Sequence, residues 1–185
     1  MRIIKEIVVD IEKCTGCRTC ELRCAVERSS VSKSLQGAVR EKIKPVSRVK
    51  VEASEEGSLP LQCRHCKDAP CLDACSTGAL HRDPETETVI YDDSKCITCW
   101  MCVMVCPFGI ISPSKERGMI QKCDRCFDME GPYCVDACPT GALMFIETKE
   151  LEDMTREKRK GVLKRSFAKE DKTEKPVISL DFSAR

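Results

Sequence analysis

The fold of this 185-residue chain is decided by one stretch, Cys96-Ile97-Thr98-Cys99-Trp100-Met101-Cys102-Val103-Met104-Val105-Cys106-Pro107. Two residues separate each of the first three cysteines from the next, three residues separate the third from the fourth, and a proline follows. One compact loop with this spacing places three thiolates on three corners of a cubane of iron and sulfide. The fourth corner must come from elsewhere in the chain. The stretch therefore predicts ligands for [4Fe-4S] clusters.

Three further groups of four cysteines follow the same pattern, so none of the sixteen cysteines is left over. The first group has the same spacing, and the second and fourth widen only the gap before their third cysteine, which a loop can absorb. Alanine and serine replace the proline after the first and second groups, and this leaves the ligands unchanged. The groups are Cys14, Cys17, Cys20 and Cys24; Cys63, Cys66, Cys71 and Cys75; and Cys123, Cys126, Cys134 and Cys138. Four groups predict four clusters.

The residues around the cysteine groups also repeat, which indicates that the chain arose by duplication. Three groups end alike, in Cys75-Ser76-Thr77-Gly78-Ala79-Leu80, Cys106-Pro107-Phe108-Gly109-Ile110-Ile111 and Cys138-Pro139-Thr140-Gly141-Ala142-Leu143. The shared glycine suits a turn with positive φ. We therefore expect each ligand loop to end in a turn of the same kind.

The entrances to two groups are similar as well. Val8-Val9-Asp10-Ile11-Glu12-Lys13-Cys14 resembles Val89-Ile90-Tyr91-Asp92-Asp93-Ser94-Lys95-Cys96, since in both an apolar run precedes polar turn residues. Each predicts a strand followed by a ligand loop. Leu143-Met144-Phe145-Ile146 predicts a further strand behind the last turn. The fold class we predict is α+β, with short strands and helices around ligand loops.

A longer stretch, residues 29–60, separates the first two groups. Within it, Arg48-Val49-Lys50-Val51-Glu52 alternates charged and apolar residues and predicts a half-exposed strand before a polar turn at residues 53–58. The basic residues of the stretch predict a solvated face, with a docking patch as the alternative: Arg40, Lys42, Lys44, Arg48 and Lys50.

The C-terminal part of the chain is densely charged from Lys149 to Lys175. Leu151, Met154 and Val162 lie only loosely at helical spacing, so we expect an exposed helix. The last apolar residues predict a tail, or alternatively an anchor on another subunit: Val177, Ile178, Leu180 and Phe182. We expect residues 1–148 to form the cluster domain and residues 149–185 a charged extension.

Composition narrows the function classes. The formal charge is +1, from 31 basic and 30 acidic residues, so no net field favours nucleic acid or an anionic membrane. No segment approaches the roughly 20 apolar residues that span a bilayer, and charge enters at Met1-Arg2-Ile3-Ile4-Lys5-Glu6 before a secretory signal can develop. We expect a cytoplasmic protein without direct membrane insertion. Cysteines in that reducing compartment indicate metal binding before disulfides.

Zinc is the main alternative metal, because paired Cys-x2-Cys knuckles bind it tetrahedrally. Zinc sites join two knuckles across a spacer, which leaves the third and fourth cysteines of each group without a role, and only His65 and His81 offer nitrogen ligands. We expect His65 to be a loop residue beside a cluster and Trp100 to shield one. Three basic residues near the cysteines are expected in solvent, with tuning of cluster potentials as the alternative: Lys95, Lys122 and Arg125.

Sequence motifs of catalysis are absent. The chain contains no Gly-x-Gly-x-x-Gly for a dinucleotide, no phosphate loop and no nucleophile constellation. We therefore predict electron transfer without substrate chemistry, so that the chain is not itself an enzyme. A structural or filament scaffold with bound clusters is the alternative of another class.

Taken together, residues 1–148 resemble the four-cluster electron-transfer subunits of molybdenum or tungsten oxidoreductases and hydrogenases. The resemblance implies two bacterial two-cluster ferredoxin-like modules, in which the fourth cysteine of each motif binds the cluster of its mate. The outer module would join motifs 14–24 and 123–138, and the inserted inner module motifs 63–75 and 96–106. The implied ligand sets are, for cluster 1, Cys14, Cys17, Cys20 and Cys138; for cluster 2, Cys24, Cys123, Cys126 and Cys134; for cluster 3, Cys63, Cys66, Cys71 and Cys106; and for cluster 4, Cys75, Cys96, Cys99 and Cys102.

Within this family, Cys20-Glu21-Leu22-Arg23-Cys24-Ala25-Val26-Glu27 and Cys63-Arg64-His65-Cys66 resemble the iron–sulfur protein paired with carbon monoxide dehydrogenase. The resemblance implies that enzyme as the catalytic partner and a second electron-transfer protein as the other partner. Small subunits of tungsten or molybdenum aldehyde and formate oxidoreductases and of hydrogenases share most of these features and stay as alternatives.

Overall fold

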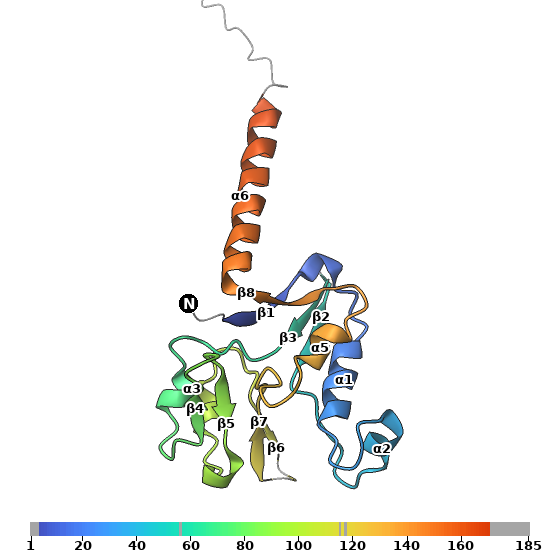
Figure 1. The fold of residues 1–185 in the computed structure, drawn as a ribbon, viewed down its shortest axis with the longest axis vertical. Coiled ribbons are helices and arrows are strands. Elements are labelled where there is room, and N and C mark those ends of the chain that lie inside the picture. The colour runs from blue at the N-terminus through green and yellow to red at the C-terminus, as the bar shows by residue number, and fades with distance from the viewer. Residues whose placement is uncertain (1–3, 56, 115, 117, 171–185) are drawn as a thin grey trace, which may run out of the picture. The chain divides into compact units, whose positions relative to one another are not determined.

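The computed structural model describes residues 4–55, 57–114, 116 and 118–170, and it describes residues 163–170 by their backbone alone. The chain divides into two compact units, Met1–Glu147 and Thr148–Arg185. The described part of the first unit combines short helices with four two-stranded antiparallel sheets (Figure 1). This is the mixed α+β architecture predicted from the sequence.

Two of the sheets join strands that flank cysteine motifs. β1 (Lys5–Val9) pairs with β8 (Leu143–Glu147), so that the strand before the first motif lies beside the strand after the last (Figure 1). β4 (Leu80–Arg82) pairs with β5 (Val89–Tyr91), which joins the end of the second motif to the start of the third. The strands expected before Cys14 and Cys96 and after Gly141 are confirmed.

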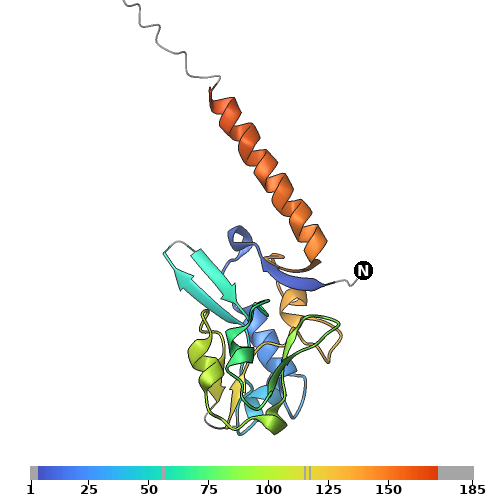
Figure 2. The same cartoon turned by 90° about the vertical axis from the view of Figure 1, so that its left-hand side faces the viewer.

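The other two sheets are hairpins that lead into motifs. β2 (Lys50–Ser54) and β3 (Gly57–Leu61) precede Cys63 and form the teal pair of arrows in Figure 2. β6 (Ser112–Ser114) and β7 (Met119–Gln121) precede Cys123. β2 begins two residues later than predicted, because the Arg48 amide donates to the Cys24 sulfur over 3.3 Å instead of joining the sheet.

The turns between strand and ligand loop are built twice in the same way. A 3₁₀ turn follows β1 at Ile11–Lys13, and another follows β5 at Asp93–Lys95. In each, an aspartate side chain accepts the amide N–H two residues on, at 3.3 Å for Asp10 and 3.1 Å for Asp92. The amides of the same two aspartates donate over 2.8 Å to Ala142 and Ala79. The similarity noted between the two entrances therefore extends to their hydrogen bonds.

The short helices carry the third cysteine of each motif. α1 (Thr19–Glu27) packs on α5 (Tyr133–Asp136), and α3 (Pro70–Asp73) packs on α4 (Met101–Val105). α2 (Leu35–Arg40) follows α1. The buried side chains gather into one core around Val49, Val51 and Leu143 and another around Leu80, Val89 and Ile120. Cysteines belong to both cores, so the ligand sites and the hydrophobic packing share the same side chains.

The second unit contains α6 (Thr148–Glu170). This helix confirms the helical prediction as far as residue 170, and residues 171–185, with the predicted tail or anchor, lie outside the described residues. Among the described helices, α6 included, none combines the length and the apolar character that crossing a membrane requires.

The basic face expected between the first two motifs is correct for Arg40, Lys42 and Lys44, which are exposed. It is wrong for Arg48, whose guanidinium lies 2.6 Å from the Asp124 carboxylate and whose side chain is only 27% exposed. Fixed-charge pairing across the fold, which no local pattern reveals, draws this arginine inward.

A buried carboxylate organises the loop after α1. Glu41 is 6% exposed; it accepts hydrogen bonds from the Ser29 hydroxyl, from the Ser30 hydroxyl at 2.8 Å and from the Ser30 and Val31 amides at 3.0 and 3.3 Å. The hydrogen bond from Ser29 is the main cause that lowers the pKa of Glu41 from 4.5 to about 2, against the opposing effect of burial. The carboxylate is therefore ionised at neutral pH and holds the loop through charge-assisted bonds.

Replacing Glu41 by glutamine weakens these bonds, because an amide offers one neutral acceptor oxygen where the carboxylate offers two charged ones. We expect the amides of Ser30 and Val31 to exchange hydrogen roughly tenfold faster in Glu41→Gln at neutral pH, as measured by mass spectrometry. Glu52→Gln is the matched control, because Glu52 is exposed on β2. Equal protection in both variants would contradict the role assigned to Glu41.

Candidate metal centres

The sixteen cysteines are all free thiols and line four cavities, four to each. Every cavity takes three cysteines from one motif and one from another. The sets are Cys14, Cys17, Cys20 and Cys138; Cys24, Cys123, Cys126 and Cys134; Cys63, Cys66, Cys71 and Cys106; and Cys75, Cys96, Cys99 and Cys102. Below, each cavity is named by its last-numbered cysteine. Including the space open to solvent, their volumes are about 310, 360, 340 and 370 Å³ in that order.

The ligand loops turn through the left-handed region of φ, which favours glycine. At several positions residues with side chains adopt it, with φ between 49° and 61°: Arg18, His65, Thr98, Trp100, Arg125 and Cys126. Such conformations cost on the order of 1–3 kcal/mol each and persist where the surroundings impose them. Here they aim backbone amides at sulfur, from His65 to Cys63 over 3.5 Å, from Thr98 to Cys96 over 3.4 Å and from Arg125 to Cys123 over 3.4 Å.

The thiols differ in how readily they ionise. Burial raises the pKa of Cys20 to about 11 and also raises the pKa of Cys134. Burial opposes ionisation of Cys138 as well, but hydrogen bonds from the Leu143 amide and the Thr140 hydroxyl lower its pKa overall. Since a metal binds the thiolate, the buried thiols must release protons when the metal is bound. Metal binding is therefore coupled to proton release in the cavities around Cys134 and Cys138.

The donor set fits an iron–sulfur cubane. Four thiols and backbone amides surround each space, and [4Fe-4S] clusters are held by four cysteine thiolates. No three His, Cys, Asp or Glu side chains in the described part of the chain are grouped as ligands of a single metal ion. The cysteines instead line the walls of spaces that have room for a larger group.

His65 and Lys122 both form hydrogen bonds with the backbone of Val89, His65 with its N–H and Lys122 with its carbonyl. The Val89 amide donates to His65 Nδ1 over 3.0 Å, and Lys122 Nζ donates over 2.6 Å to the Val89 carbonyl. Both side chains are buried, at 6% and 3% exposure. Burial, followed by the charges of Lys122 and Arg125, lowers the pKa of His65, so its ring is neutral. His65 lines the Cys106 cavity, as its expected place beside a cluster requires.

The expectation of solvent exposure is correct for Lys95, which pairs with Asp92 at 2.9 Å on the surface. It is wrong for Lys122 and for Arg125, which is 8% exposed. Lys122 directly follows β7 and donates to the Val89 and Cys123 carbonyls. Arg125 lies three residues further on in the ligand loop, where the thiols of Cys123 and Cys63 interact with its charge. Trp100 lines the Cys102 cavity and packs on the core around Val89, as the shielding role requires.

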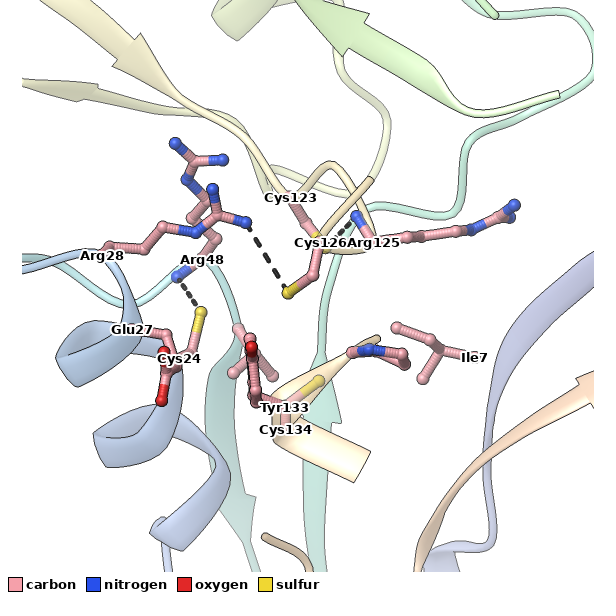
Figure 3. A pocket seen from close by; sticks show the side chains of 12 residues that line it. Ile7, Cys24, Glu27, Arg28, Arg48, Cys123, Arg125, Cys126, Tyr133 and Cys134 are labelled. Carbon is pink, nitrogen blue, oxygen red and sulfur yellow. Dashed lines mark hydrogen bonds between the residues drawn. The ribbon is translucent and has the colours of Figure 1, made fainter. Parts of the chain in front are cut away.

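The Cys134 cavity, whose lining residues are drawn in Figure 3, has a neighbouring charge cluster that no sequence pattern predicted. Asp124 accepts hydrogen bonds from Arg28 at 2.5 Å and from Arg48 at 2.6 Å. Arg28 also donates to the Cys126 sulfur over 3.7 Å. The available signal was an acidic residue between Cys123 and Cys126, where the second motif has Arg64.

Comparison with known proteins assigns the chemistry of these cavities. Residues 56–148 match the family described as "4Fe-4S dicluster domain". The chain belongs to this family. It is a [4Fe-4S] protein, and its sixteen cysteines equal the number of ligands that four such clusters need.

Similar proteins extend over most of the chain. An "Iron-sulfur protein" of Rhodospirillum rubrum is 36% identical over 176 residues, covering 84% of this chain and 90% of that protein. The "Electron transport protein HydN" of Escherichia coli K12 is 34% identical over 170 residues, covering 83% and 94%. The "Thiosulfate reductase electron transfer subunit PhsB" of Salmonella typhi is 35% identical over 156 residues, covering 77% and 76%.

Removal of the His65 ring should destabilise the Cys106 cavity. In His65→Ala the buried Val89 N–H loses its acceptor, which costs roughly 1–3 kcal/mol. We expect the visible absorbance of the clusters to decay several-fold faster on warming than in the wild type. His65→Asn, which keeps a side-chain acceptor, should decay at an intermediate rate. His81→Ala removes the exposed histidine of β4 and is the control; a His65→Ala variant as durable as this control would show that the bond to Val89 is dispensable.

Proposed function

We propose that this chain is the electron-transfer subunit of an oxidoreductase complex and relays single electrons through its four clusters. The observation that carries the proposal is the grouping of all sixteen cysteines into four cavities of four. The similarity to proteins whose names describe electron transport supports it. The chain conducts electrons, and a partner subunit performs the catalysis.

The ligand sets we assign are the four sets that line the cavities. In each set the fourth thiolate comes from a second motif, so that every cluster ties two motifs together. The first and last motifs form an outer module and the two middle motifs an inserted inner module. Duplication of one ancestral module is supported by the matching turns at Asp10 and Asp92 and by the equivalent placing of sheets β1–β8 and β4–β5.

Electron transfer requires a fixed, partly dry environment around each centre. When bound, a cubane cluster supplies a one-electron redox couple whose potential depends on its charge, hydrogen bonds and exposure. The chain's own residues hold the thiolates in place, donate amide N–H groups to sulfur and exclude water. The Leu80 amide, for example, donates to Cys75 over 3.4 Å. Apolar residues such as Ile110 and Val89 line the Cys106 cavity.

For the catalytic partner we favour carbon monoxide dehydrogenase, with a second electron-transfer protein as the acceptor. The support is the resemblance carried by residues 20–27 and 63–66. A tungsten or molybdenum oxidoreductase or a hydrogenase is the alternative, and similarity to the electron transfer subunit of a reductase supports that alternative.

Anaerobic purification provides the first test. The protein should be brown, contain about sixteen irons per chain and undergo reversible reduction and reoxidation, because four cubanes each hold four irons and accept one electron. Iron analysis and electron paramagnetic resonance measure this. A colourless zinc protein would refute the cluster assignment, and redox-inert clusters would favour a structural scaffold.

Cysteine substitution tests the ligand sets. If Cys138 completes the set of Cys14, Cys17 and Cys20, then Cys138→Ser and Cys17→Ser should lose the same signal in the paramagnetic resonance spectrum of the reduced protein. Cys134→Ser, four residues away in the same motif as Cys138, should lose a different one. A common loss for Cys138→Ser and Cys134→Ser would show that each motif holds its own cluster and would contradict the shared arrangement.

The partner is tested by supplying electrons from defined enzymes. Purified carbon monoxide dehydrogenase with carbon monoxide should bleach the clusters of this protein many times faster than formate dehydrogenase with formate or hydrogenase with hydrogen. Faster reduction by either of the other enzymes would reject carbon monoxide dehydrogenase as the partner and leave the electron-transfer function intact.

A further inference from the structure

We propose that Arg28 sets the potential of the cluster in the Cys134 cavity and makes that cluster the strongest electron acceptor of the four. The inference rests on the proposed function, since it requires a cluster in that cavity. It assigns to Arg28 a tuning role, exerted through the Cys126 thiolate and through space, and to Asp124 the role of holding the guanidinium in place.

Arg28 is placed for this role by the end of α1. It caps the helix, and its side chain is only 14% exposed. One terminal nitrogen donates both to Asp124 Oδ1 over 2.5 Å and to Cys126 Sγ over 3.7 Å. Arg28 lines the cavity, and its Nε is buried without a hydrogen-bond partner in the described structure. Figure 3 shows the guanidinium directed at the Cys126 sulfur. A buried donor next to this sulfur-lined space is suited to a sulfur acceptor.

Positive charge exceeds negative charge around this cavity. The guanidinium-bearing Arg28 and Arg48 line it, whereas the Arg125 side chain, also part of its wall, extends away from the cysteines (Figure 3); Glu27 is the only carboxylate among its described lining residues. Glu27 is paired with Arg23 at 2.8 Å, and Asp124 is shared by two arginines. The carboxylates therefore do not neutralise the guanidinium groups.

The other cavities lack buried guanidinium groups among their described lining residues. The Cys102 cavity is lined by uncharged residues apart from its cysteines. The Cys138 and Cys106 cavities include Arg18 and Arg64, but both side chains are exposed, where solvent screens their charge.

The two modules differ at equivalent positions. Arg28 follows the fourth cysteine of the first motif by four residues, and Ile110 occupies that position after the third motif and lines the Cys106 cavity. The outer module therefore has a largely buried cation, 14% exposed, where the inner module has a hydrocarbon. Because a ligand loop forms with isoleucine at this position in the inner module, the arginine is not a general requirement of the loop.

Reduction adds one negative charge to a cluster, so a nearby cation and a hydrogen bond to a ligand sulfur favour the reduced state and raise the potential. The effect is larger in a buried site, where the low dielectric strengthens charge interactions. The buried, fixed guanidinium of Arg28 meets both conditions. Electrons that enter the chain will therefore rest preferentially on this cluster.

The test is a redox titration of the complete, cluster-loaded protein followed by electron paramagnetic resonance. The cluster in question is identified as the signal that Cys126→Ser removes. In the wild type this signal should have the highest midpoint potential. Arg28→Met keeps the length of the side chain and removes its charge and donors. We expect the midpoint of this signal alone to fall by an amount equal to a tenfold or greater loss of electron affinity, about 59 mV for one electron.

Two further variants separate tuning from a structural effect. Asp124→Asn removes the counter-charge and should raise the same midpoint, whereas Arg28→Lys keeps the charge and should shift it less than Arg28→Met. Arg40→Met removes an exposed arginine of α2 that lines none of the four cavities and should leave all midpoints in place.

The inference is overturned if Arg28→Met leaves this midpoint unchanged, if it shifts all four midpoints equally, or if Asp124→Asn lowers the midpoint as well. Should Arg28→Met fail to take up its clusters, the opposite shifts expected of Asp124→Asn and Arg28→Lys still decide the question. A wild-type protein without reducible clusters would refute the proposed function itself. Four reducible clusters whose potentials do not respond to Arg28 would instead refute only this inference.

Discussion

The antiparallel pairing of β1 with β8 is the interaction on which the rest of the first unit depends. It places Ile7 opposite Phe145 and so closes a loop that contains nearly the whole unit. Closing a long loop costs conformational entropy that grows only slowly with its length, and the burial of Ile7 and Leu143 in one core offsets part of it. Only after this closure do Cys138 and the first motif line the same cavity.

Within this closed loop, the β4–β5 sheet joins two motifs in the same way, over a shorter stretch of the chain. β4 and β5 join the middle motifs, and the hairpins β2–β3 and β6–β7 lead into the second and fourth motifs. Lys122, directly after β7, hydrogen-bonds to the Val89 carbonyl of β5. The fourth motif is thereby tied to a strand that precedes the third, and the two pairs of motifs are held in one compact unit.

The ligand loops bury several polar side chains of the fold, including Lys122, His65 and Arg125. Left-handed residues such as Thr98 and Arg125 turn their amides toward sulfur. These polar groups then need hydrogen-bond partners: the ammonium of Lys122, the neutral ring of His65, and the guanidinium groups of Arg28 and Arg48, which share Asp124. The fold provides these partners with backbone groups of Val89 and with Asp124. The strained loops indicate that cluster binding contributes to the stability of the folded chain.

Much of this protein was determined by its sequence alone. The cysteine spacing identified the cofactor, the apolar runs before Cys14 and Cys96 and after Gly141 predicted three strands, and the charge run after residue 148 predicted a helix. These features depend on neighbours within a few residues, so local chemistry is sufficient to reveal them. The resemblance to a family also implied ligand sets that match the cavity linings, although the substitutions at Cys138, Cys17 and Cys134 are needed to establish them.

The surroundings of the sites were decided only by the tertiary structure. Lys122, Arg125 and Arg48 were predicted to be solvated cations, yet all three are drawn into the fold, and the pairing of Arg28 with Asp124 was not predicted. Burial of a charge depends on partners far away in the chain: Arg28 and Asp124 are 96 residues apart. Such a pair becomes favourable only after folding has brought both residues together and excluded water around them. In that low-dielectric environment, the attraction between opposite charges is stronger than it is between charges in water.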